Sequence, residues 1–412
     1  MKMLNWCKPF NIFCLLDNLQ YRFQEPAFEC LMAVGAKKDI SASAGNAFGQ
    51  LKQFSAEQKS WLFGHLSYDL KNETETLHSS NPDGIGFDDM YFFVPEIVLQ
   101  LDQKGVTISC DTSAAEIFSA IEAGSPVISK PMNLTASVQN KISKEAYLQS
   151  VKKLQQHILR GDCYEINFCQ EFFMEDVEIE PLAVYHQLTT LSPNPFSVLY
   201  KNNNRYCIGA SPERYFKKTG SKIISQPIKG TSKRNHANAL LDEESKNSLL
   251  NSEKEKSENV MVVDLVRNDL SRVCVAGSVK VEELFGIYSF PNVHQMISTV
   301  SGEVNENTDW VDIIKATFPM GSMTGAPKKK VMELIEEYEQ TKRGLFSGSV
   351  GYVNPAGDAD FNVVIRSILY NAETRYLSFQ TGGAITFYSD AEKEYDECLL
   401  KATAIMQVLK GV

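Results

Sequence analysis

Three β-rich runs, SVGYV (349–353), VVIRSILY (363–370) and YLSF (376–379), precede one helical segment from about residue 390 to 409. β-branched and aromatic residues dominate the runs, whereas the segment after them repeats its apolar residues at helical spacing. Strands and helices therefore occur in separate runs along the chain. This order predicts a mixed α+β architecture.

The same two patterns continue toward the N-terminus. Ser143 can cap a helix whose apolar positions include Tyr147 and Val151, and Gly161 is suited to end it. Further strands are expected at 91–94, 97–101, 105–109, 196–200, 205–208 and 222–224, and further helices over about 238–270 and from Pro327 onward. Residues 125–142 are polar and contain two prolines, so we expect an N-terminal region, 1–135, joined there to a second region, 143–409.

The composition is that of an ordinary globular protein. The 412 residues are 43% hydrophobic and 22% charged, which is enough apolar material for a large core. A formal net charge of -10 argues against nucleic-acid binding, although a local basic pocket could still bind a small anion. Nine cysteines without a C-x-x-C pair indicate reduced thiols, and no segment reads as a signal peptide or membrane span. We therefore expect a cytoplasmic protein with no membrane partner.

Lys229 stands in the hexapeptide QPIKGT (226–231), between a proline and a glycine. Pro227 restricts the backbone, and Gly230 permits a positive φ or the close approach of a ligand. A lysine held in this way can serve as a nucleophile if burial or a nearby cation lowers its pKa. The alternative is an exposed loop lysine.

Two helical segments each carry a pair of glutamates one turn apart. Glu394 and Glu397 share a stripe with Lys401 in the final helix, and Glu255 and Glu258 repeat the spacing near residue 250. Two such helices could hold one Mg²⁺ between them, together with an anionic substrate. The alternative is a pair of solvated charged faces, since EKEK (253–256) can form ordinary surface pairs. The apolar run VMVV (260–263), however, indicates an interior close by.

Two glycine-containing turns are candidate anion sites. GSMTGAPK (321–328) leads into a helix start, where free N–H groups, hydroxyls and Lys328 favour a carboxylate, or where Thr324 simply caps the helix. QTGGA (380–384) follows a strand, and Gly382 and Gly383 there suit close approach of a ligand, although paired glycines also mark plain turns.

Three further polar residues each have a structural alternative. Arg366 lies among β-formers, either on a solvent face or as a buried partner for a carboxylate, and the solvent face is the default. His294 is one of six histidines and fits a structural role as well as a catalytic one. Glu213 is a candidate acid, or else forms a surface salt bridge with the adjacent Arg214.

Six motifs occur in an order that resembles one family. They are SPER (211–214), PIKGT (227–231), ENVMVVDLVRNDL (258–270), FPNVH (290–294), GSMTGAPK (321–328) and EYDE (394–397). Together they are similar to the chorismate-utilising enzymes, which include the anthranilate, aminodeoxychorismate, isochorismate and salicylate synthases. The resemblance covers about 143–409 and implies a large two-sheet antiparallel β-sandwich surrounded by helices, with the N-terminal region interwoven.

The lysine of PIKGT resembles the aminodeoxychorismate branch, since anthranilate synthases usually carry alanine there. This implies that Lys229 attacks C2 of chorismate, Glu213 protonates the departing C4 hydroxyl, and ammonia then enters at C4 and expels the lysine. The product would serve 4-aminobenzoate and folate synthesis. It also implies a Mg²⁺ ion bound by Glu258 and Glu397, with Glu255 and Glu394 in support. The alternatives are an anthranilate synthase component I and, more remotely, a non-catalytic dicarboxylate-binding protein.

The resemblance also implies a set of residues that line the chorismate pocket. Arg366 would pair with the enolpyruvyl carboxylate, and the other members are His294, Ser322, Thr324, Gly382, Gly383 and Lys401. Glu165 departs from the pattern, because ammonia-using relatives usually have glutamine there and water-adding relatives have lysine. It argues against water addition, and its own role stays open.

The proposed reaction needs ammonia. None of the nine cysteines lies in the Gly-x-Cys-x-Gly setting of a glutaminase nucleophile. We therefore expect a separate glutamine amidotransferase subunit as the partner that supplies ammonia.

Overall fold

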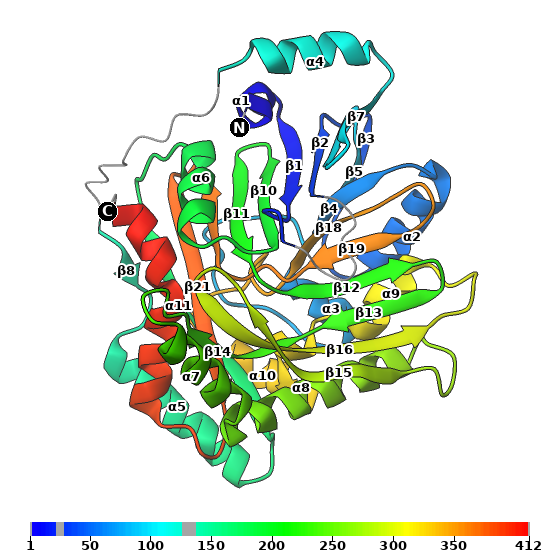
Figure 1. The fold of residues 1–412 in the computed structure, drawn as a ribbon. Helices are drawn as coiled ribbons and strands as arrows, with labels where there is room; N and C mark the ends of the chain where they lie inside the picture. Colours follow the sequence, from blue (N-terminus) through cyan, green and yellow to red (C-terminus); the bar gives the residue numbers. More distant parts are fainter. Residues whose placement is uncertain (1, 22–28, 126–136, 411–412) are drawn as a thin grey trace.

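The computed structural model describes residues 2–21, 29–125 and 137–410, in which two large antiparallel sheets pack together with helices around them (Figure 1). Within these residues the first sheet has eleven strands and the second has ten. Helices and antiparallel strands thus share one chain, as the sequence predicts for an α+β architecture.

The first sheet runs, in spatial order, through β17 (Gly325–Ala326), β9 (Glu165–Met174), β21 (Tyr376–Ile385), β20 (Ser367–Asn371), β11 (Arg205–Ser211), β10 (Phe196–Asn202), β1 (Ile12–Asp17), β2 (Cys30–Val34), β6 (Ile97–Asp102) and β7 (Gly105–Cys110), with β8 (Gln139–Asn140) beside β9. The second runs through β14 (Ile228–Lys233), β16 (Val293–Glu303), β13 (Lys222–Gln226), β12 (Arg214–Thr219), β19 (Ala359–Asn362), β18 (Ser349–Val353), β4 (Leu62–Leu66), β5 (Met90–Val94) and β3 (Lys38–Ala42), with β15 (Lys280–Ser289) beside β16.

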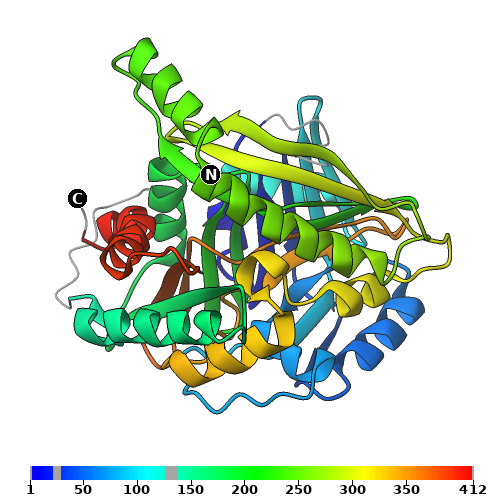
Figure 2. The same ribbon diagram turned by 90° about the horizontal axis from the view of Figure 1, so that it is seen from below.

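The helices are α1 (Lys2–Cys7), α2 (Ala47–Gln58), α3 (Lys71–Thr74), α4 (Ala114–Ala123), α5 (Lys144–Leu159), α6 (Pro181–Leu191), α7 (Ala239–Leu250), α8 (Glu253–Ser271), α9 (Trp310–Thr317), α10 (Lys328–Tyr338) and α11 (Ala391–Lys410), with the short 3₁₀ turns η1 (Tyr68–Leu70) and η2 (Gly321–Met323). Seen from below, α8 crosses the near face of the molecule, while α7 projects outward at the upper left (Figure 2). Among the described residues, no helix combines the length and the apolar character that crossing a membrane requires.

Alternation along β1 shows why the first sheet is buried on both faces. Cys14 joins the core cluster that the two sheets share, whereas Phe13 and Leu15 join a second cluster with residues of α6 and α11. Successive side chains of a strand point to opposite faces, so both faces need apolar residues. A strand covered on both sides therefore appears in the sequence as a continuous apolar run.

The N-terminal segment supplies strands to both sheets. β1 pairs with β10 in the first sheet, and β4 pairs with β18 in the second. Residues 126–136 of the expected connection lie outside the described residues. The division into regions 1–135 and 143–409 stays a prediction.

Most predicted elements are confirmed, with four corrections. The expected helix over 238–270 is two helices, because Asn251 and Ser252 separate α7 from α8 and the Ser252 hydroxyl caps α8. α10 begins one residue after Pro327, which is its N-cap. The predicted strand at 363–370 begins only at Ser367. QTGGA (380–384) lies within β21 and does not follow it, because the strand is longer than its β-branched and aromatic residues indicate.

Candidate active site

Lys229 lies on β14 and forms an ion pair with Glu165 on β9. Its Nζ is 3.1 Å from Glu165 Oε1, and the two side chains are 11% and 3% exposed. The other carboxylate oxygen of Glu165 is buried without a hydrogen-bond partner. The reading of Lys229 as an exposed loop residue is therefore wrong, because tertiary packing joins the two sheets at this pair.

The pKa of Lys229 is shifted in the opposite direction from the lowering that would make a lysine nucleophilic. Burial disfavours its charged form, but the carboxylates of Glu165, Glu258 and Glu213 outweigh burial and raise the pKa of Lys229 above its ordinary value. Lys229 is thus an ammonium in this structure. It becomes nucleophilic only after a neighbouring group or solvent takes its proton.

Glu213 is buried between β11 and β12. Burial raises the pKa of Glu213 to about 7, and the Ser322 hydroxyl and the charge of Lys229 oppose that rise. The neighbouring Arg214 is also buried, and its guanidinium binds Asp360 with nitrogen–oxygen distances of 3.0 and 3.1 Å. The surface salt bridge considered from the sequence is therefore wrong. A carboxyl group with a pKa near neutrality suits general acid catalysis.

Three carboxylates from two helices lie within 4 Å of the Lys254 ammonium. Lys254 Nζ lies 3.8 Å from Glu258 on its own helix α8, and 3.5 and 3.9 Å from Glu394 and Glu397 on α11. Burial raises the pKa of Glu258 to about 7, although Lys229 and Lys254 act against the rise. Solvated, unconnected charged faces are therefore excluded for these two helices.

Two glycines let the backbone approach this carboxylate cluster. A Cβ added at Gly383 would lie 3.2 Å from Glu394 Oε2 and 3.8 Å from Glu397 Oε1. A Cβ at Gly230, which has a φ of 94°, would lie 3.0 Å from Glu255 Oε2. The glycine after Lys229 thus brings β14 against α8, and Gly383 brings β21 against α11.

Lys401 links α11 to the same strand. Its Nζ is 2.8 Å from Glu397 Oε1 and donates a hydrogen bond of 2.8 Å to the carbonyl oxygen of Gly382. Burial raises the pKa of Glu397, but Lys401 and Lys254 outweigh it, so the carboxylate titrates below its ordinary range. Gly382 therefore contributes a carbonyl and close packing.

The donor set fits a hard divalent cation in part. Carboxylates are the ligands that Mg²⁺ prefers, and Glu258 Oε1 is buried without a hydrogen-bond partner. Across the described ranges, however, no three acidic, histidine or cysteine side chains are grouped as a ready metal site. The Lys254 ammonium lies between the carboxylates that a cation would share.

Arg366 lies in a bend between β19 and β20 and not inside a strand. It has a φ of 53°, which is uncommon for a residue other than glycine. Its guanidinium is partly buried and, in the described part of the chain, makes no hydrogen bond or ion pair. Burial lowers the pKa of Arg366, and the charge of Glu397 opposes this. The default of a solvent-facing strand residue is wrong, and the group is free to bind a carboxylate.

The remaining predicted residues have protein partners of their own. Both ring nitrogens of His294 are engaged, with Ser289 at 2.8 Å and Asp242 at 3.2 Å. Thr324 does not cap α10, because its hydroxyl donates to the Met320 carbonyl. The ammonium of Lys328 lies 2.6 Å from Asp269 on α8 and does not point to a free anion site.

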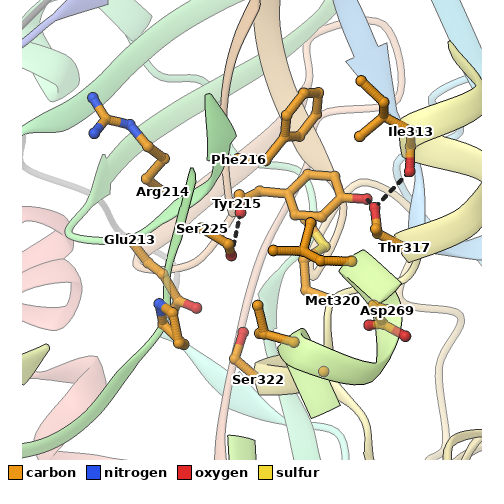
Figure 3. Close-up of a pocket in the computed structure, with 14 residues that line it drawn as sticks. Glu213, Arg214, Tyr215, Phe216, Ser225, Asp269, Ile313, Thr317, Met320 and Ser322 are labelled. Atoms are coloured by element: carbon orange, nitrogen blue, oxygen red, sulfur yellow. Dashed lines mark hydrogen bonds between the residues drawn. The ribbon is translucent and has the colours of Figure 1, made fainter. Parts of the chain in front are cut away.

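A small pocket adjoins Glu213 and Ser322 (Figure 3). Apolar side chains of α8 and α9 form its far side, where the Tyr215 hydroxyl bonds to Thr317. Its lining residues do not include Lys229, Arg366 or the four clustered glutamates. The pocket is therefore lined by the candidate acid but not by the other charged groups of the site.

Sequence reasoning missed Lys254, which it treated as part of a surface pair. The signal was present, because Lys254 is four residues before Glu258 and so lies on the same helical face. It also left Glu165 without a role. No local pattern indicates that Glu165 meets a lysine 64 residues away.

Comparisons with known proteins identify the family of this chain. Residues 13–407 match the family model described as chorismate binding enzyme. Aminodeoxychorismate synthase component 1 from Escherichia coli (strain K12) is 35% identical over 355 residues, which cover 84% of this chain and 76% of that protein. Anthranilate synthase component 1 from Aquifex aeolicus (strain VF5) is 32% identical over 370 residues, which cover 85% of this chain and 74% of that protein.

Solved structures share the fold. Anthranilate synthase component I from Streptococcus pneumoniae TIGR4 superposes with a TM-score of 0.78 at 24% identity, covering 94% of this chain and 96% of that one. The menaquinone-specific isochorismate synthase from Escherichia coli gives 0.79 at 16% identity, covering 98% and 91%. The predicted two-sheet architecture is confirmed.

Proposed function

Because this chain belongs to the chorismate binding enzyme family and is an enzyme that acts on chorismate, we propose that it replaces the C4 hydroxyl of chorismate by an amino group. The product, 4-amino-4-deoxychorismate, leads to 4-aminobenzoate and folate. Aminodeoxychorismate synthase component 1 from Bacillus subtilis (strain 168), 32% identical over 363 residues, supports this branch.

The observation that carries the proposal is the buried position of Lys229. Its ammonium lies 3.1 Å from Glu165 and within the electrostatic influence of Glu213 and Glu258. Ordering a long lysine side chain in the interior costs conformational entropy and desolvation. A reactive role for the amine would explain why the protein buries this lysine in spite of the cost. The free guanidinium of Arg366 supports an anionic substrate, because a partly buried cation without a partner is unfavourable.

The proposed reaction proceeds in two displacements. Lys229 gives up its proton and its Nζ bonds to C2 of the ring, while the C4 hydroxyl departs as water with a proton from Glu213. Ammonia then bonds to C4, the C2–Nζ bond breaks, and the released amine takes up a proton again. A covalent nucleophile divides one difficult displacement into two easier ones.

Glu258 and Glu397 would hold the Mg²⁺ ion, with Glu255 and Glu394 in support. When bound, the ion neutralises and orients a substrate carboxylate. Arg366 would pair with the second carboxylate through its two parallel N–H groups. The two anchors would together fix the ring relative to Lys229 and Glu213.

Ammonia is proposed to come from a glutamine amidotransferase subunit. The E. coli relative is named component 1, which supports a second component. Purified chain supplied with glutamine as the sole nitrogen source should form no product, whereas ammonium should support turnover. Product from glutamine without a second protein would contradict this part of the proposal.

Product identity tests the proposal. Purified protein with chorismate, Mg²⁺ and ammonium should yield 4-aminobenzoate only when aminodeoxychorismate lyase is added. Lys229→Ala should abolish this product, while Lys233→Ala, at the exposed end of the same strand, should retain it. Anthranilate formed without lyase would favour the second candidate, anthranilate synthase component I, which the Aquifex relative supports.

A further inference from the structure

We propose that Lys254 is an internal counter-cation that occupies the divalent-cation position among the four glutamates and must leave it when the metal binds. The inference rests on the proposed function only in taking Glu255, Glu258, Glu394 and Glu397 as the carboxylates that hold Mg²⁺. It concerns the affinity of this site for the ion.

The position of the Lys254 ammonium is central to the cluster. Among the ion pairs of the described residues, Lys254 alone joins carboxylates of α8 to carboxylates of α11, since Lys401 reaches only Glu397. Its three nitrogen–oxygen distances, 3.5, 3.8 and 3.9 Å, exceed the roughly 2.7–2.9 Å of a direct charge-assisted hydrogen bond. The ammonium thus lies between the carboxylates, with one long hydrogen bond of 3.5 Å donated to Glu394 Oε1.

Lys254 neutralises the cluster incompletely. Glu258 Oε1 is buried and has no hydrogen-bond partner despite the ammonium nearby. A divalent cation would supply twice the charge, at metal–oxygen distances of about 2.0–2.1 Å. An ammonium and a metal ion cannot share this space, because like charges repel.

Lys254 has a route out of the site. Its side chain is 51% exposed, whereas those of Glu394 and Glu258 are 3% and 10% exposed. It stands in the first turn of α8 on a flexible four-carbon stem, so its head group can move into solvent while the helix stays in place. Glu258 and Glu394 are held by packing, whereas the Lys254 head group is able to move.

Lys254→Met tests the inference, with Lys256→Met as the matched control. Lys256 lies on the same helix and pairs only with the exposed Glu253, at 3.8 Å, so both variants lose one charge and keep the aliphatic stem. Removing a charge about 4 Å from the ligands should tighten Mg²⁺ binding at least about 10-fold. Calorimetric titration of the chorismate-free protein measures this affinity, and Mn²⁺ paramagnetic resonance provides a second readout.

Thermal unfolding gives an independent arm. In EDTA, Lys254→Met should unfold at a lower temperature than the native protein, because the clustered carboxylates lose their counter-cation. Saturating Mg²⁺ should close or reverse that difference, and Lys256→Met should match the native protein in both conditions. If Lys254→Met does not fold in EDTA, Lys254→Gln purified in Mg²⁺ provides the affinity comparison after dialysis.

Two results overturn the inference. One is Mg²⁺ affinity in Lys254→Met equal to or weaker than in the native protein, and the other is no Mg²⁺ binding by either. Formation of anthranilate in the product assay would overturn the C4-amination proposal alone. The metal affinities would then still decide the role of Lys254.

Discussion

The Lys229 ammonium and the Glu165 carboxylate form an ion pair of 3.1 Å across two sheets, between β14 and β9. Each side chain is mostly buried, and the second oxygen of Glu165, Oε2, finds no hydrogen-bond partner among the described residues. The pair holds the proposed nucleophile in its protonated form. The charge of Glu165 therefore helps to set the pH at which Lys229 can react.

Glu165→Gln should make Lys229 a stronger nucleophile at low pH. The carboxylate raises the pKa of Lys229 against the effect of burial, so a neutral side chain of the same shape should lower that pKa. The acid limb of the profile of kcat/KM for chorismate should move to lower pH by a similar amount. Labelling of Lys229 by an amine reagent, followed by mass spectrometry, should speed up in parallel. An unchanged limb and labelling rate would show that Glu165 does not control the proton.

Glu213→Gln should lower kcat about 10²–10⁴-fold, the usual contribution of a general acid. Burial raises the pKa of Glu213 to about 7, so the proton that the acid must donate is present below that pH and lost above it. The native enzyme should lose activity as pH rises through about 7, and this limb should be missing in the variant. Glu253→Gln, at an exposed position on α8, serves as the control. A retained alkaline limb in Glu213→Gln would assign that limb to another group.

Gly383→Ala and Gly382→Ala should fail in different ways. A Cβ at Gly383 first meets Glu394 Oε2, at 3.2 Å, so the protein should fold but bind Mg²⁺ more weakly, by about 10-fold or more, since a displaced carboxylate loses its ligand geometry. A Cβ at Gly382 would lie 2.1 Å from the Phe168 carbonyl oxygen, which is backbone and cannot move aside. Gly382→Ala should lower the free energy of unfolding, measured in urea, by about 2–4 kcal/mol. Equal folding and equal Mg²⁺ affinity in the two variants would contradict this distinction.

Glu171→Gln should flatten the pH dependence of stability. Burial raises the pKa of Glu171 to about 7 from an ordinary 4.5, and one of its oxygens is buried without a partner. A carboxyl group whose pKa is higher in the folded state does not reduce the free energy of unfolding at a pH below its unfolded pKa. The reduction grows as the pH rises from the unfolded pKa toward the folded pKa. Between pH 4.5 and 8, the free energy of unfolding of the native protein should therefore fall by about 2–3 kcal/mol more than that of the variant. Urea unfolding at the two pH values measures the difference, and parallel curves would contradict it.

Several parts of the fold followed from local sequence, because their physical causes are local. Ser143 caps α5 as its position predicts, and the apolar spacing of Tyr147 and Val151 matches the face that α5 buries. The division between α7 and α8 was missed, since Asn251 and Ser252 end one helix and begin the next without a proline or glycine. The bend at Arg366 was missed because its positive φ depends on the flanking strands and not on its own preference.

The sequence by itself determined the order of the motifs and the positions of the glycines near the site. It also determined that the glutamates of each pair lie one helical turn apart, because spacing along one element fixes which side chains share a face. It did not determine which elements meet. Tertiary structure decided that Glu165 faces Lys229 and that Lys254 lies among the carboxylates of two helices. It also decided that the half-buried Arg366 side chain has no ion-pair partner among the described residues. These relationships join residues far apart in the chain, and burial, which only the packed sheets create, sets their charge states.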